Sequence, residues 1–279
     1  MGNESEKEFL AAYKQKDYDC PSVTADVIAL MIRPQESDNY RRNSENKLSL
    51  LLIKRGGHPY KDMWALPGGF LQRGETVEQC ALREIEEETN VAPVSLMPVG
   101  VYSEPGRDPR GWIISNAFVS VISEESVQQV GRDDASDARW FDVSFEPGEE
   151  EGSHILTLES GDIILRSVLA EEKTCFGRTS FTEKEGGSIA FDHARMIAAA
   201  LSALRSAAKD YETILDFLPE EFTLSAFQKV QETVMNVSVL PANFRRMVSG
   251  YVTETGNYER GSGHRPAKLY RRSSKGEKP

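Results

Sequence analysis

The sequence predicts an α+β protein in two parts. In the first part, short apolar and β-branched segments precede and follow one helix pattern, and an Ala-rich helix closes the series. In the second part, two short helix patterns precede a segment with the glycine turns of a β-hairpin. The length of 279 residues suits about two domains. We therefore expect a polar leader over 1–20, a sandwich over 21–209 and a smaller domain over 210–279.

The strands of the first part are predicted from their apolar and β-branched runs. They are expected at Val23–Ile32, Leu48–Lys54, Val94–Tyr102, Ile113–Ile122 and Trp140–Val143, with a hairpin formed by Ile155–Leu158 and Asp162–Leu169. Polar or glycine-containing stretches separate the strands, and turns are expected at Glu146–Gly152 and Glu183–Gly187.

The helices of the first part are predicted from their caps and apolar spacing. Thr76 and Gln79 have the spacing of a capping box, so a helix is expected from Thr76 to about Thr89. Phe191–Ala208 is rich in Ala and Leu and is expected to form a long helix. A short helix in the leader and a connector over Asp210–Glu221 complete the expected elements.

Three glutamates share one face of the capped helix. Glu84, Glu87 and Glu88 stand at positions i, i+3 and i+4, where like charges repel. A divalent cation removes this conflict, and carboxylate oxygens suit Mg²⁺ or Mn²⁺. An acidic, solvated helix face is the alternative. Arg83 points to a neighbouring face, where pairing with a carboxylate such as Glu75 would fix the preceding loop against the helix.

The wider pattern resembles the box of the Nudix hydrolases. It runs from Gly69 through Glu75 and Arg83 to Val91, and reads GFLQRGETVEQCALREIEEETNV. Asn90 stands where the family has glycine, and Asn tolerates the left-handed backbone that often follows a helix. The resemblance implies the Nudix α/β/α sandwich, with the box as loop-helix-loop, and a magnesium-assisted attack of water on a nucleoside-linked diphosphate.

The resemblance also implies a role for each residue of the box. The metal ligands would be Glu84, Glu87, Glu88 and the carbonyl of Gly69. Glu84 or another nearby carboxylate would assist the attacking water. Arg83 and Glu75 would support the catalytic site structurally.

The substrate must be selected by residues outside the box. The predicted substrate-binding residues are Gly68, Gly69, Arg107 and Arg110. The arginines can hold phosphate, with a charged surface turn as the alternative. The segments around 64–70 and 105–111 resemble those of Nudix domains that handle ADP-ribose. For Tyr102 and Trp112, a core role is favoured over stacking on an adenine.

The second part has the element order of a winged helix-turn-helix. Thr223 caps a helix to about Met235, Pro241 opens a second helix to about Tyr251, and glycines punctuate the hairpin over Thr253–Tyr270. This segment resembles the winged-helix end of the Nudix-related transcriptional regulators. A dimerisation subdomain is the alternative.

The predicted contacts to double-stranded DNA come from the second helix and the wing. They are Asn243, Arg245, Arg246, Arg265 and Lys268. Phe244, Met247 and Val248 have helical spacing with Leu240, and we expect these apolar residues in the core. A winged helix implies a two-fold homodimer on a palindromic site.

The charge distribution agrees with a DNA-binding end. The net charge is −11, but residues 243–279 carry +6 and the remainder −17. An acidic body repels nucleic acid, whereas a basic end attracts phosphate. The three cysteines are widely spaced, so neither a disulfide framework nor a zinc site is expected. With no apolar stretch long enough to span a bilayer and no secretory signal, we expect a cytoplasmic protein that binds no membrane.

Two functions are compatible with these features. The first is a Mg²⁺-dependent Nudix hydrolase that acts on ADP-ribose or a related nucleoside diphosphate and is fused to a DNA-binding winged helix. The second is a transcriptional regulator of NAD or sugar metabolism that senses such a ligand with little or no hydrolysis. The box is often degenerate in regulators, and every box carboxylate is present here, so we favour the first. A sugar sensor ranks last, because it would not need an intact metal site.

Overall fold

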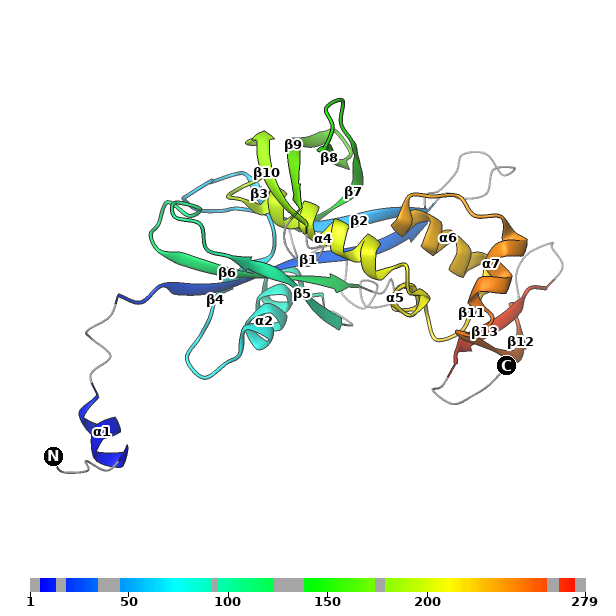
Figure 1. The fold of residues 1–279 in the computed structure, drawn as a ribbon, viewed down its shortest axis with the longest axis horizontal. Coiled ribbons are helices and arrows are strands. Elements are labelled where there is room, and N and C mark those ends of the chain that lie inside the picture. The colour runs from blue at the N-terminus through cyan, green and yellow to red at the C-terminus, as the bar shows by residue number, and fades with distance from the viewer. Residues whose placement is uncertain are drawn as a thin grey trace.

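The computed structural model describes most of the chain. The described residues are 6–13, 19–34, 46–91, 95–122, 138–173, 179–259 and 266–273. They form a ten-stranded sheet with helices in the first part and a three-stranded sheet with helices in the second (Figure 1). The predicted α+β class is confirmed. Within the described ranges, no helix combines the length and apolar character needed to cross a membrane.

The large sheet is mixed. Its strands are β1 (Ser22–Pro34), β2 (Asn46–Lys54), β3 (Trp64–Ala65), β4 (Gly68–Phe70), β5 (Ser95–Tyr102), β6 (Ile113–Val121), β7 (Ala138–Pro147), β8 (Ser153–Ser160), β9 (Ile163–Lys173) and β10 (Thr179–Glu185). The order is β10-β9-β8-β7-β2-β1-β6-β5, with β3 paired to β2 and β4 paired to β1. Strand β1 runs parallel to β6 and antiparallel to β2 and β4. This pairing holds the short β4, which begins the box, at the centre of the sheet.

Helices α2 (Val77–Thr89) and α4 (His193–Ala207) cover opposite faces of this sheet (Figure 1). The other helices of the described chain are α1 (Glu6–Ala12), α5 (Tyr211–Leu215), α6 (Leu224–Met235) and α7 (Pro241–Val248). Side chains alternate along β1, so Val27 shares a core with Ile85 of α2, whereas Ile28 shares a second core with Ile197 of α4. The chain therefore has the predicted α/β/α layering.

The ends of α2 follow from its capping residues. The Thr76 hydroxyl accepts from the Gln79 backbone N–H at 3.3 Å, and the Thr76 N–H donates to the Gln79 side chain at 2.8 Å. Asn90 ends the helix with φ of 54°, in the left-handed region. Both predictions are confirmed. The caps fix where α2 begins and ends, and so fix the positions of the box glutamates.

The second part is a winged helix. Thr223 caps α6 and Pro241 is the first residue of α7, as predicted. The wing strands β12 (Val252–Tyr258) and β13 (Lys268–Arg272) pair, and β11 (Phe222–Thr223) adds a strand to β13. The fully buried rings of Phe227 and Phe244 pack edge to face, with centroids 5.1 Å apart. These rings belong to the same continuous core as α4.

Three elements differ from the prediction. Strand β7 is ten residues long, instead of the expected Trp140–Val143, because its pairing with β2 and β8 continues through polar residues. Strand β10 includes residues 183–185, which were expected in a turn; as the last strand of the sheet, it tolerates their charges. The connector contains α5, in which Ile214 and Leu215 are buried.

Candidate active site and nucleic-acid interface

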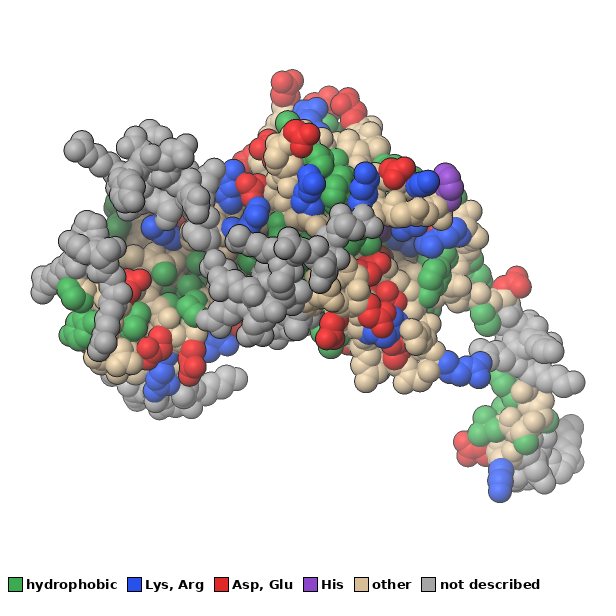
Figure 2. Space-filling view, turned by 180° about the vertical axis from the view of Figure 1, so that it is seen from behind, with side chains coloured by type: hydrophobic (Ala, Val, Ile, Leu, Met, Phe, Trp, Pro, Cys, Tyr) green, Lys and Arg blue, Asp and Glu red, His purple; other side chains and the backbone are tan. Residues whose placement is uncertain are grey.

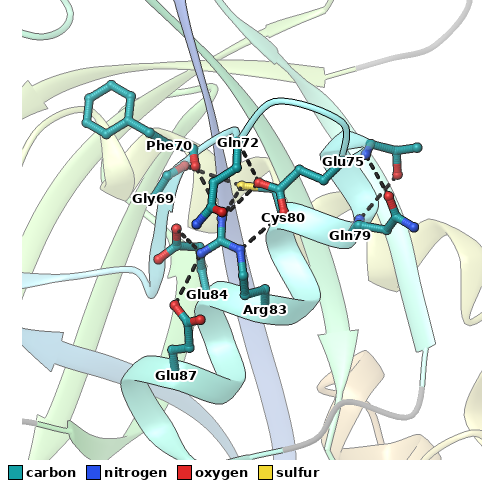
Figure 3. A network of polar contacts seen from close by, with 10 residues as sticks. Gly69, Phe70, Gln72, Glu75, Gln79, Cys80, Arg83, Glu84 and Glu87 are labelled. Atoms are coloured by element: carbon teal, nitrogen blue, oxygen red, sulfur yellow. Dashed lines mark hydrogen bonds and ion pairs between the residues drawn. The ribbon is translucent and has the colours of Figure 1, made fainter.

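Arg83 is the centre of the polar network on α2 (Figure 3). Its Nη2 and Nε lie 2.8 and 3.1 Å from the two carboxylate oxygens of Glu75. The backbone N–H of Gln72 also donates to Glu75. The hydrogen bonds from Arg83, followed by that from Gln72, lower the pKa of Glu75 to about 2, and the same pairing raises the pKa of Arg83. The expected pairing is present, and it holds the loop before α2 against the helix.

The same guanidinium contacts two of the predicted metal ligands. Its Nη1 lies 2.7 Å from Glu84 and 3.2 Å from Glu87 (Figure 3). Across the residues that the structure describes, no three His, Cys, Asp or Glu side chains converge closely enough to hold a metal ion. A site formed by Glu84, Glu87 and Glu88 would therefore require Arg83 to release carboxylate oxygens. The ligand roles of these glutamates stay predictions.

Glu88 lies apart from Arg83, on the side of the helix that faces the sheet. Its Oε2 accepts a hydrogen bond of 2.8 Å from the Gly68 backbone N–H. Burial raises the pKa of Glu88 to about 7, and the charges of Glu84 and Asp26 add to this effect, while the Gly68 hydrogen bond opposes it. Asp26 is buried in β1 and accepts a hydrogen bond from the Ser115 hydroxyl. Sequence reasoning missed Asp26 because it lies within an apolar strand.

Gly69 lies directly against the carboxylate of Glu84. A Cβ at this position would come within 2.4 Å of that carboxylate, so a side chain here would displace Glu84. The Gly69 carbonyl accepts a weak hydrogen bond from the Cys80 thiol at 3.7 Å. The donor chemistry fits Mg²⁺, because carboxylate and carbonyl oxygens are hard ligands, and the charges of Glu84 and Asp26 outweigh that of Arg55 around Glu88.

Buried His193 connects α4 to this region. Its Nδ1 accepts a hydrogen bond of 2.9 Å from the Leu66 backbone N–H, and its Nε2 lies 3.8 Å from Asp26. Burial lowers the pKa of His193, although the charge of Asp26 opposes this shift. The imidazole thus fixes the start of α4 to Leu66, between β3 and β4, and lies beside Asp26.

The two predicted substrate arginines lie in different environments. The Arg107 side chain is only 4% exposed, and its Nη2 and Nε lie 2.7 and 3.0 Å from Asp192. Arg110 is 38% exposed and pairs with Asp108 at 2.7 Å. Arg107 is thus held in a buried ion pair, whereas Arg110 remains accessible. Both substrate roles stay predictions.

Arg110 belongs to a cluster of arginines and aromatic rings beside β4. Its Cζ lies 5.1 Å from the ring centroid of Phe70 and 5.4 Å from that of Phe191. The Cζ of Arg55 lies 4.8 Å from the Phe191 centroid, and the Tyr60 ring lies 4.6 Å from it. Sequence reasoning missed Arg55, Tyr60 and Phe191, because Phe191 is far from the others in the sequence. We call these five residues the arginine–aromatic cluster.

The expected core roles hold for only one of the two remaining aromatic residues. Tyr102 packs against the main core, and burial raises its pKa to about 12. Trp112 is 57% exposed, so its predicted core role is wrong. Trp112 lies immediately before β6, in the loop that leads into the strand, where the sheet does not cover it.

Acidic side chains gather along one edge of the molecule, at the position of α2 (Figure 2). Glu78, Glu86 and Glu87 on α2 are exposed. This exposed acidic surface continues from the box carboxylates and leaves the face of α2 open to solvent.

The predicted DNA contacts on α7 are accessible. Asn243, Arg245 and Arg246 are all exposed. In the wing, the Lys268 ammonium lies 2.8 Å from the carboxylate of Glu254, and both side chains are largely solvated. Arg265 lies outside the described residues. The DNA-binding roles stay predictions.

The predicted core of α7 is half correct. Phe244 and Val248 are fully buried, as expected, but Met247 and Leu240 are 42% and 71% exposed. The helix is only eight residues long and buries a narrow stripe of residues four apart. Leu240 precedes this stripe as the N-cap, and the Met247 sulfur accepts a hydrogen bond from Tyr211 near the surface.

Family models match both parts of the chain. The model of the NUDIX domain matches residues 37–154, and that of the NrtR DNA-binding winged helix domain matches residues 214–272. The chain is therefore a two-domain protein that joins a Nudix domain to a winged helix domain of the NrtR type.

Individual relatives resemble either the whole chain or the Nudix domain. The chain is 27% identical over 270 residues to the ADPR responsive transcriptional repressor NtrR of Acinetobacter baylyi, covering 96% of this chain and 88% of that protein. It is 48% identical over 101 residues to the ADP-ribose pyrophosphatase of Methanocaldococcus jannaschii, covering 36% of this chain and 58% of that protein. The crystal structure of a MutT/nudix family protein from Enterococcus faecalis superposes with a TM-score of 0.72 at 29% identity, covering 98% of this chain and 95% of that one.

Proposed function

We propose that this protein is a DNA-binding regulator whose Nudix domain binds ADP-ribose or a related nucleoside diphosphate and hydrolyses it with Mg²⁺ or Mn²⁺. Its similarity to an ADPR responsive repressor along nearly the whole chain supports the regulatory role. Its similarity to an ADP-ribose pyrophosphatase over the Nudix domain supports the substrate class. Both names describe those proteins, and the assignment to this chain is our inference.

The buried carboxylate of Glu88 is the observation that carries the hydrolytic part. A largely buried anion beside Glu84 and Asp26 is unfavourable, and the charge of Arg55 offsets this cost only in part, so a bound cation would stabilise the site. Glu84, Glu88 and the Gly69 carbonyl would hold the ion, with Glu87 as the further ligand. A bound Mg²⁺ would neutralise phosphate charge and lower the pKa of water. Arg83 and Glu75 would hold the loop against the helix. A box carboxylate would accept the proton of the attacking water.

A hydrolysis assay on the purified full-length protein tests this function. With Mg²⁺, ADP-ribose should be converted to AMP and ribose 5-phosphate, and the double substitution Glu87→Gln and Glu88→Gln should abolish turnover. Glu86→Gln is the matched control, because Glu86 is exposed on the same helix and occupies a position of the box at which any residue is allowed. The control should retain the activity of the wild type. If no member of a panel of ADP-ribose, NAD, NADH and sugar nucleotides is turned over, the hydrolytic part is refuted.

The ion pairs of Arg83 favour ligand sensing without turnover as a second candidate function. Arg83 neutralises Glu84 and Glu87 in the present arrangement, so these glutamates do not depend on a metal ion. In this case ADP-ribose would bind without being consumed, and its binding would change the affinity for DNA. Isothermal titration alongside the hydrolysis assay separates the two functions.

The DNA-binding part is tested on α7. We expect binding to the promoter of its own operon, as a homodimer, with an affinity that falls as salt rises. Arg245→Ala with Arg246→Ala should reduce the slope of log affinity against log salt by about 2, because about two phosphate contacts are lost. Fluorescence anisotropy across a salt series measures this slope. Wild-type protein that shows no salt-sensitive binding to DNA would refute the regulatory role.

A further inference from the structure

We infer that Arg55, together with Arg110, binds the diphosphate of the ligand, and that the ring of Phe191 supports both guanidinium groups. This inference rests on the proposed function and identifies which side chains of the same site hold the anion. It adds Arg55 to the site and leaves Arg107 with a structural role.

Two guanidinium groups converge on one ring. The Cζ atoms of Arg55 and Arg110 lie 4.8 and 5.4 Å from the centroid of Phe191. Arg110 also lies over the ring of Phe70, the residue that follows Gly69 in β4. The two positive charges therefore lie beside the strand that lines the predicted metal site. Planar guanidinium groups that rest on rings are well suited to phosphate, because each presents a fork of N–H donors.

Arg55 has donors to spare. Its Nε donates to the Pro59 carbonyl at 2.8 Å, but within the described part of the chain no carboxylate forms an ion pair with it. Burial, followed by the charge of Arg110, lowers the pKa of Arg55, while Asp108, Glu88 and Asp26 oppose this shift. Asp108 already pairs with Arg110, so Arg55 is the guanidinium of the two whose charge an added anion would compensate.

Arg110 has its own ion pair with the buried Asp108 but is 38% exposed, so it can contact a ligand without losing that partner. Arg107 differs from it in exposure. The Arg107 side chain is nearly inaccessible to solvent, and its Nε and Nη2 both donate hydrogen bonds to Asp192, the residue that precedes α4. Removal of this ion pair to bind phosphate would leave a buried carboxylate without its partner. Arg107 therefore holds the start of α4 in place and does not bind the ligand.

Two residues of the cluster have a strained backbone conformation, which indicates that the surrounding structure fixes the orientation of their rings. Phe191 and Tyr60, whose rings pack at a tilt of 59°, have φ of 55° and 60°. A bulky residue with positive φ carries a conformational cost and occurs where the surrounding structure requires one orientation. Phe191 is one of these strained residues, and its ring is the one that both Arg55 and Arg110 contact.

The test is ligand binding by variants of the full chain, measured by isothermal titration with Mg²⁺. The probe is the ADP-ribose analogue with a methylene group in place of the oxygen between its phosphates, which resists hydrolysis. Arg55→Ala and Arg110→Ala should each weaken binding by about 10- to 100-fold, the usual effect of losing a charge-assisted hydrogen bond. Arg55→Lys should fall between Arg55→Ala and wild type, because lysine keeps the charge but loses the planar fork.

Arg139→Ala is the matched control. Arg139 is an exposed arginine whose Cζ lies 5.6 Å from the ring of Trp64, which is not one of the five residues of the cluster. Its removal deletes the same charge and the same kind of ring contact, and it should leave binding unchanged. Melting temperatures of all variants exclude misfolding as the cause of any loss.

The outcomes separate this inference from the proposed function. If the wild type binds the analogue and Arg55→Ala binds equally well, the role of Arg55 is refuted while the proposed function stands. If Arg139→Ala weakens binding as much as Arg55→Ala, the effect is general electrostatics and the inference is refuted. If the wild type does not bind the analogue, the proposed function fails, and the assignment of Arg55 fails with it.

Discussion

Replacing Glu88 with glutamine should stabilise the metal-free protein at alkaline pH. The pKa of Glu88 rises from its ordinary value of 4.5 to about 7, mainly because the carboxyl is buried. A difference of this size corresponds to about 3 kcal/mol between the ionised and neutral forms. The glutamine side chain would be neutral at every pH and can still accept the hydrogen bond from Gly68. The variant therefore avoids the cost of the buried charge.

The sign of the effect depends on pH. Below pH 4.5, Glu88 is protonated in both the folded and unfolded states and costs nothing. As pH rises from 4.5 to 7, the unfolded chain releases the proton first, so the wild type loses stability, and above pH 7 the full cost applies. The Glu88→Gln variant should consequently gain on the order of 3 kcal/mol at pH 8 and little at pH 4.5.

Thermal unfolding of the metal-free full-length protein at the two pH values measures this difference. For a chain of this size, about 3 kcal/mol raises the melting temperature by roughly 6–10 °C. Glu86→Gln on the same helix should show no such dependence on pH. Added Mg²⁺ should raise the melting temperature of the wild type at pH 8 but not that of Glu88→Gln. Equal melting temperatures of Glu88→Gln and wild type at pH 8 would refute the cost of the buried charge from which this prediction starts.

Two further predictions concern the winged helix domain. Phe227→Ala should lower the free energy of unfolding by about 3–5 kcal/mol, because it removes a fully buried ring that packs on Phe244. Urea denaturation followed by circular dichroism measures the loss. A change below about 1 kcal/mol would contradict this packing. Glu254→Gln should strengthen DNA binding several-fold at low salt, because it removes a negative charge from the wing and releases Lys268 from its ion pair. The free energy of unfolding should barely change, since an exposed ion pair contributes little to it. Anisotropy titrations check the second prediction, and an unchanged affinity would argue against a wing contact.

The local signals of the sequence predicted most of the fold. The capping box at Thr76, the left-handed Asn90 and the proline that begins α7 are short-range features, and each lies where the sequence indicated. The lengths of β7 and β10 were wrong, because strand ends depend on the neighbouring strand with which they pair. That neighbour is fixed by the tertiary structure and not by the residues of the strand itself.

The candidate site was predictable only in part, for the same reason. The box residues lie within one continuous segment, 69–91, so a pattern can reveal them. Asp26, Arg55 and Phe191 come from three distant segments and meet only after the sheet and α4 have packed. The environment of Arg107 was also not predictable, since a charged loop residue that looks accessible in the sequence has a buried partner, Asp192, 85 residues away.

Helix α4 links the two halves of the molecule mechanically. It starts at His193, which is hydrogen-bonded to Leu66, and follows Asp192, which is paired with Arg107; its far end shares a core with α6 (Figure 1). Its 15 residues make a rod of about 22 Å. A tilt of about 5° at the ligand end would therefore displace the opposite end by about 2 Å. In the proposed dimer, a displacement of this size would change the spacing between the two winged helix domains, and ligand binding in the Nudix domain would then alter the proposed binding to DNA.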